Sequence, residues 1–159
     1  MRAIAFALTL GFAGTALADG SVPHSLETWD NAARLGLPLW LKAWLGFLAI
    51  SFLASLFFVR DRPAARAVAI GFAVSHVLVI GIEASEVTRL TTGLVSLTHA
   101  IGWTPALFVM LREPGRTEPM THYGWWSRQM LFVLVAALIF DYRDAGMYLY
   151  YQLTGHPAL

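Results

Sequence analysis

Residues 67–86 read "AVAIGFAVSHVLVIGIEASE" and carry no formal charge before Glu83. A helix needs about 20 mostly apolar residues, about 30 Å of length, to cross the hydrocarbon core of a membrane. This stretch has that length, and one imidazole, His76, lies near its middle. It therefore predicts a membrane-spanning helix with a polar side chain at mid-depth.

The rest of the chain has the same character. Of its 159 residues, 57% are hydrophobic and only 13% are charged. This is too little polar surface to coat a soluble globule of the same size. The apolar residues also gather in blocks close to the length of a span. The composition therefore predicts an all-α integral membrane protein with several spans.

The composition also excludes several functional classes. Cysteine is absent, which excludes disulfides, thiolate metal sites and iron–sulfur clusters in any compartment. The net charge is +1 and there is no basic run, so nothing indicates binding to nucleic acid. The sequence contains no nucleophile–base motif, phosphate loop, dinucleotide fingerprint or zinc-protease motif.

Residues 1–18, "MRAIAFALTLGFAGTALA", have the pattern of a secretory signal peptide. One basic residue precedes a short apolar stretch, and small residues precede the polar "DGS". We expect cleavage after Ala18, with an uncleaved first span as the alternative. Residues 19–36 then form a short polar arm on the outer side of the membrane.

Four spans are predicted, forming a four-helix transmembrane domain over residues 37–159. Two of the loops between them are rich in arginine, and bases in short loops mark the cytoplasmic side. Both mature termini should then lie on the outer, periplasmic side of a bacterial-type inner membrane. The spans are about 39–59, 67–86, 91–111 and 125–148; the inner bases are Arg60, Arg62, Arg66, Arg112, Arg116 and Arg128, and the outer ones Arg34, Lys42, Arg89 and Arg143.

Two histidines lie within neighbouring spans. On a helix of 3.6 residues per turn, His76 shares one face with Glu83 and Glu86. A polar face inside a membrane normally points toward other helices, because charge is costly in lipid. His99 lies in the next span at a similar depth, since the midpoint between the two histidines falls in the connecting turn. If both side chains face the bundle, His76 and His99 can meet inside it.

Several kinds of site would use this pair. A b-type haem would be held by both imidazoles, although directly packed helices, about 8 to 10 Å apart, leave no space for a macrocycle. A metal site would add a carboxylate, although Glu83 lies about 10 Å along the helix from His76. A proton or ion route would use His76 as a relay, with Glu83 and Glu86 at its outer mouth. The simplest expectation is interhelical hydrogen bonds, each worth about 0.6 kcal/mol.

Charged residues gather where the second and fourth spans are expected to reach the outer interface. Four acids and two bases would leave a net negative patch there. Such a patch would bind a divalent cation or a basic partner. The simpler expectation is that salt bridges tie the second span to the fourth. The six residues are Glu83, Glu86, Arg89, Asp141, Arg143 and Asp144.

Trp103 is the tryptophan that lies well inside a predicted span. It neighbours Gly102 and Pro105. We expect it to pack between helices next to a proline bend, with a place in the wall of a quinone or lipid cleft as the alternative.

These features predict a small inner-membrane protein without catalytic activity. Its expected role is that of an accessory or structural subunit of a larger membrane complex, in contact with lipids and with other membrane subunits or a second copy. The alternative is a membrane redox protein, with a b-type haem or a metal, or a proton- or ion-conducting protein, centred on His76 and His99.

Overall fold

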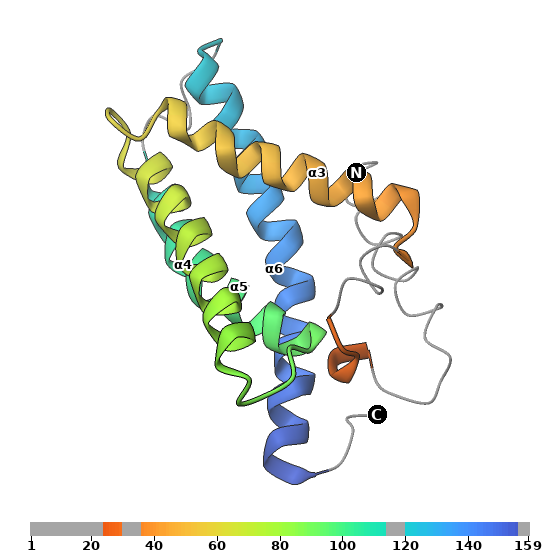
Figure 1. The fold of residues 1–159 in the computed structure, drawn as a ribbon. Coiled ribbons are helices and arrows are strands. Elements are labelled where there is room, and N and C mark those ends of the chain that lie inside the picture. The colour runs from red at the N-terminus through yellow and green to blue at the C-terminus, as the bar shows by residue number, and fades with distance from the viewer. Residues whose placement is uncertain (1–23, 30–35, 114–119, 156–159) are drawn as a thin grey trace.

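The computed structural model describes residues 24–29, 36–113 and 120–155. Within these residues the chain is helical apart from one isolated antiparallel bridge (Figure 1). The predicted signal peptide and most of the predicted polar arm lie outside the described residues. The elements are η1 (His24–Leu26), α3 (Leu39–Leu53), η2 (Ala54–Phe57), α4 (Pro63–Ser85), α5 (Thr92–Arg112) and α6 (His122–Thr154).

Three of the described helical segments are long and apolar enough to cross a membrane: Leu39–Phe57, Pro63–Ser85 and Thr92–Arg112. They coincide with three of the predicted spans to within a few residues. The apolar stretch of α6, residues 130–140, is shorter because Arg128 and Asp141 flank it. The all-helical fold is therefore confirmed, together with three apolar helices typical of a membrane protein.

Local sequence sets the helix ends. α4 begins at Pro63, a few residues before the predicted start, because a proline in the first helical turn needs no backbone donor. Thr91 caps α5: its hydroxyl oxygen accepts a hydrogen bond from the backbone N–H of Leu94 at 3.3 Å. α4 ends at Ser85, and the next residue, Glu86, adopts the left-handed conformation with φ of 52°. The helix predicted through Glu86 therefore stops one residue earlier.

α4, α5 and α6 form one layer with α5 in the middle (Figure 1). The α4–α5 contact is closest at two glycines. A Cβ atom on Gly71 would lie 2.4 Å from the Gly102 carbonyl oxygen, and one on Gly102 would lie 2.5 Å from the Gly71 carbonyl oxygen. Small residues allow such close crossings between membrane helices. Backbones in contact leave no space for a planar cofactor between these two helices.

α3 crosses this layer obliquely (Figure 1). Its buried residues all lie in its C-terminal half. There Ser51 accepts two hydrogen bonds from α6: Trp126 Nε1 donates to its carbonyl oxygen at 3.0 Å, and Gln129 Nε2 donates to its hydroxyl at 2.9 Å. The N-terminal half diverges from the layer, and Leu39 is 83% exposed. α3 is therefore attached to the other helices at one end.

The main hydrophobic core lies between the attached half of α3 and the layer. At the α3–α4 corner, Phe58 meets Tyr123 of α6 edge-on, with 5.4 Å between ring centroids. We call this part of the molecule, with loop 58–62 and the start of α6, the arginine end. The largest buried side chains of the core are Trp103, Phe52, Met110, Met130, Leu134 and Leu138.

The opposite end holds residues 24–29, the α4–α5 turn and the last part of α6, and we call it the arm end. Trp29 donates its backbone N–H to the Leu90 carbonyl oxygen at 2.8 Å, and Thr92 donates to the Glu27 carbonyl oxygen at 3.0 Å. A Cβ atom on Gly93 would lie 2.8 Å from the Ser25 carbonyl oxygen. The N-terminal arm and the α4–α5 turn, which the sequence places on one side of the membrane, thus lie together.

Candidate functional site

A cavity of about 570 Å³ opens between the diverging half of α3 and the α4–α6 layer. Its volume is in the range of pockets that hold small organic ligands, about 300 to 1,000 Å³. Most of its lining is apolar, and aromatic side chains come from every wall. They include Trp40 and Trp44 from α3, Phe72 from α4, Trp103 from α5, and Phe132 and Phe140 from α6.

The cavity changes character along its length. On α6 its lining runs from Phe132 to Asp144, which corresponds to about 18 Å along the helix. Near the arginine end of the molecule, the cavity is lined by apolar residues such as Leu48 and Phe132. Near the arm end, it is lined by Thr92 and Arg143. The cavity is therefore amphipathic, with an apolar end and a polar end.

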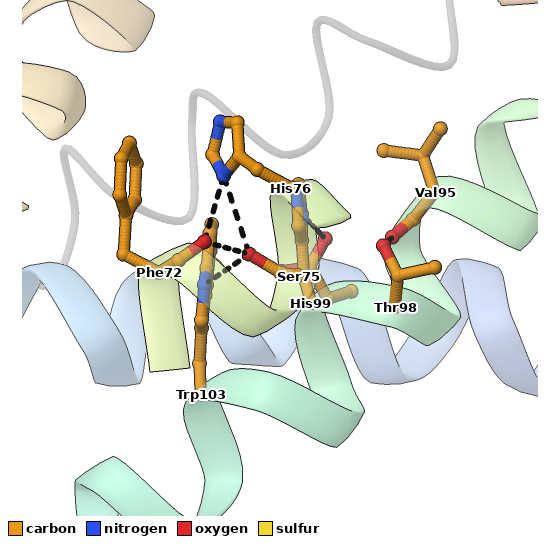
Figure 2. Close-up of polar contacts among 8 residues, drawn as sticks. Phe72, Ser75, His76, Val95, Thr98, His99 and Trp103 are labelled. Atoms are coloured by element: carbon orange, nitrogen blue, oxygen red, sulfur yellow. Dashed lines mark hydrogen bonds and ion pairs between the residues drawn. The ribbon is translucent and has the colours of Figure 1, made fainter. Parts of the chain in front are cut away.

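His76 enters the cavity from α4. Its Nδ1 lies 2.8 Å from the Phe72 carbonyl oxygen. Because a carbonyl oxygen can only accept, we assign the ring proton to Nδ1, which leaves a lone pair on Nε2. The ring also lies against the Phe72 ring, with 4.1 Å between centroids. Figure 2 shows that the second ring nitrogen points away from the α4 backbone, where it is free to accept a hydrogen bond.

His99 enters the same cavity from α5. Its Nδ1 lies 3.3 Å from Asp141 Oδ1 of α6, a long hydrogen bond that joins two helices. We assign the proton to Nδ1 because the carboxylate accepts, and Nε2 then carries the lone pair. The other carboxylate oxygen, Oδ2, is buried and has no hydrogen-bond partner in the described part of the chain. The site therefore contains an acceptor that lacks a donor.

Trp103 connects the two histidines. Its indole stacks on the His99 imidazole with 4.0 Å between centroids and 9° between planes. Its Nε1 donates to the Ser75 hydroxyl at 3.1 Å, and that hydroxyl lies 3.4 Å from His76 Nδ1 (Figure 2). Trp103 thus packs between helices and also lines the cavity. His76 and His99 lie in one site, linked through Ser75 and Trp103 and not by a hydrogen bond to each other.

The predicted charged patch is divided. Glu83, Glu86 and Arg89 are exposed around the α4–α5 turn and lie outside the cavity lining, whereas the three charged residues of α6 line it. α5 lies between α4 and α6, and no ion pair joins the first group to α6 among the residues that the structure describes. The α6 residues are Asp141, Arg143 and Asp144.

Among the residues that line the cavity, two imidazole nitrogens can bind a metal or haem iron: Nε2 of His76 and Nε2 of His99. Histidines that bind metals usually donate their other ring N–H to a carbonyl or a carboxylate, and both rings have that arrangement. No group of three histidine or acidic side chains that could hold a metal ion occurs within the described ranges. A haem would have to occupy the cavity itself, since α4 and α5 touch.

Sequence reasoning did not predict the Asp141–His99 contact or the role of Ser75. The sequence predicts Asp141 at the outer interface, where the fourth span ends. In the structure it lies level with His99, seven residues and therefore about 10 Å into the bundle from the start of α5. The feature of the sequence that could have indicated this contact is an acidic residue directly after a long apolar stretch.

Comparison with known proteins finds no matching family model, no similar curated protein and no similar solved structure. The chemistry of the cavity is therefore the basis for assigning a function.

Proposed function

We propose that this chain is a four-span membrane protein, without catalytic activity, that holds a small apolar ligand between α3 and the α4–α6 layer. We further propose that it acts as an accessory component of a larger membrane assembly. The observation that carries the proposal is the cavity of about 570 Å³ with aromatic walls and a few convergent polar groups. Sites for small molecules typically have this composition and size.

The packing of α6 supports a fourth span. Its 33 residues correspond to about 50 Å of helix, more than the roughly 30 Å of a hydrocarbon core. Tyr123 near its start contacts Phe58 at the arginine end, and Tyr148 near its other end lies beside Gly93 at the arm end. α6 therefore runs beside α5 from one end to the other, and both should cross the membrane together.

The charges support an orientation. The arginine end holds Arg60, Arg62 and Arg66, and such residues are typical of cytoplasmic loops. The arm end then faces the periplasmic side of an inner membrane, as does the polar end of the cavity. A signal peptide over residues 1–18 would deliver the N-terminus to that side.

The exposed surface of α3 supports a role within an assembly. Large apolar side chains, among them Phe47, Ile50 and Leu53, are exposed on it. α3 is attached at one end, so lipids or another membrane subunit can cover this surface. Partner subunits or a second copy should therefore co-purify in mild detergent.

The test is to purify the protein in mild detergent and identify bound small molecules by extraction and mass spectrometry. A bulky side chain on the cavity wall, in Ala49→Trp, should reduce the amount of ligand per protein at least fivefold. Ala73→Trp, on an exposed position outside the lining, should leave it unchanged. Equal amounts of ligand in both variants and the wild type would contradict the proposal.

A redox or proton-conducting protein is the second candidate, and the free Nε2 atoms of His76 and His99 favour it. A reduced-minus-oxidised spectrum and metal analysis of the same preparation test the redox form. A Soret shift or a stoichiometric metal would establish it, and a colourless, metal-free protein would exclude it. For conduction, His76→Ala and Glu83→Gln should abolish proton flux in liposomes, and a wild type without flux would exclude that form.

A further inference from the structure

The geometry of the cavity points to the class of its ligand. We propose that it binds an aromatic ring that carries hydroxyl groups and an apolar tail, that is, a molecule of the quinol class. One hydroxyl donates to Nε2 of His99 and the second to Nε2 of His76. This inference rests on the proposed function, because it requires that the cavity holds a small molecule.

The first argument is the hydrogen-bonding character of the histidine wall. His76 donates its ring proton to a carbonyl oxygen of its own helix, and His99 donates toward Asp141. Both rings therefore present acceptors to the cavity. A ligand that donates hydrogen bonds complements these two acceptors, because an imidazole nitrogen with a lone pair can only accept.

The second argument is the aromatic lining of the cavity. Phe72, Trp103 and Phe132 contribute to its walls, and a flat ring packs favourably against the edges as well as the faces of aromatic side chains. The His99 ring is itself held parallel to the Trp103 indole, which fixes the direction of its ring edge. A flat ring with donors on its edge fits this arrangement better than an aliphatic alcohol does.

The third argument is the gap beside α3. This helix is attached only at its C-terminal half, and Leu45 and Leu48 of α3 line the cavity. An apolar tail can lie along these residues and leave between α3 and the layer toward the lipid. The ring hydroxyls then meet the histidines while the tail stays in an apolar environment.

The experiment compares three ligands of matched length: an alkyl hydroquinone, its dimethyl ether, and a linear alkanol. Binding to the protein in nanodiscs is measured by isothermal titration calorimetry under reducing conditions, with empty nanodiscs as the blank. We expect the hydroquinone to bind at least tenfold more tightly than the ether and the alkanol. The ether keeps the ring and tail but cannot donate.

The matched variants are His99→Phe and His76→Phe, which keep a flat ring, and His122→Phe at the exposed start of α6 as the control. Each of the first two should lower the preference for hydroquinone over ether at least threefold, and the control should not change it. Size-exclusion profiles establish that the variants are folded.

The outcomes separate this inference from the proposed function. If hydroquinone and ether bind the wild type equally well, the quinol assignment is wrong, while the ligand cavity stands. If the alkanol binds as tightly as the hydroquinone, the ring is not recognised and the assignment is wrong. If none of the three binds and extraction also yields no ligand, both proposals fail.

Discussion

The imidazole of His99 lies parallel to the indole of Trp103, with 4.0 Å between the ring centroids. Trp103 is only 2% exposed and is hydrogen-bonded to Ser75 of the neighbouring helix. The stack therefore ties a cavity residue to the buried contact between α4 and α5. A polar group inside a membrane bundle that is held in this way can keep one orientation toward a ligand.

The Trp103–Ser75 hydrogen bond should contribute measurably to stability. Ser75→Ala leaves a buried indole N–H without an acceptor, which should cost about 1 to 3 kcal/mol. In a double-mutant cycle with Trp103→Phe, the coupling should be about 0.6 to 1.7 kcal/mol, the range for polar contacts between membrane helices. Equilibrium unfolding in mixed micelles measures both. The control is Ser85→Ala, whose hydroxyl donates to a carbonyl oxygen of its own turn. A coupling near zero between Ser75 and Trp103 would contradict the hydrogen bond between them.

The close contact between α4 and α5 should tolerate no side chain at Gly71. Gly71→Ala places a Cβ atom against the Gly102 carbonyl, and this overpacking should cost about 1 to 3 kcal/mol. Gly81→Ala, in the same helix, has open space around its Cβ and should be neutral or stabilising by up to about 1 kcal/mol. Thermal unfolding in detergent distinguishes the two. Equal melting temperatures would show that the helices are not in contact at Gly71.

Replacing Gly93 by alanine should detach residues 24–29 of the N-terminal arm from the α4–α5 turn. A Cβ atom there would lie 2.5 Å from Tyr148 Cβ and 2.8 Å from the Ser25 carbonyl oxygen. Hydrogen exchange of the backbone N–H of Trp29, which pairs with Leu90, should accelerate at least tenfold in Gly93→Ala. Gly146→Ala, with open space around its Cβ, serves as the control. Unchanged exchange in both variants would contradict the pairing of arm and turn.

The four-span topology can be tested with single cysteines, because the chain has none of its own. Val87→Cys and Leu153→Cys should react with a membrane-impermeant thiol reagent from the outer side of cells or spheroplasts. Asp61→Cys and Met120→Cys should react only after permeabilisation. These positions are exposed in the structure. Labelling of residues 120 and 153 from the same side would mean that α6 does not cross.

The sequence was sufficient to predict three of the apolar helices and the similar depth of the two histidines. Length and hydropathy defined α3, α4 and α5 closely, since spans are limited by membrane thickness. The depth argument placed His76 and His99 at similar levels, and both line one cavity. This argument needs only the rise per residue and an antiparallel pair of helices.

The attachment of α3, the Asp141–His99 contact and the separation of the charged residues could not be predicted, because hydropathy does not determine how helices pack against each other. Nothing in residues 39–53 indicates that α3 is attached at one end, because helix tilt follows from contacts with neighbours. The contact of Asp141 with His99 depends on the register of α6 against α5, which places Asp141 beside a residue seven positions into α5 and not at the level of its start. The division of the outer charges followed from α5 lying between α4 and α6.

The most direct test of the ligand cavity is photo-crosslinking with an alkyl hydroquinone that carries a diazirine on its tail, followed by peptide mass spectrometry. Adducts are expected on cavity residues such as Trp44, Leu48 and Phe132, and Ala49→Trp should remove them. Ile80 and Ile139, which are exposed and outside the lining, report labelling from the lipid phase. Adducts confined to such exposed residues, and unchanged in Ala49→Trp, would contradict the account.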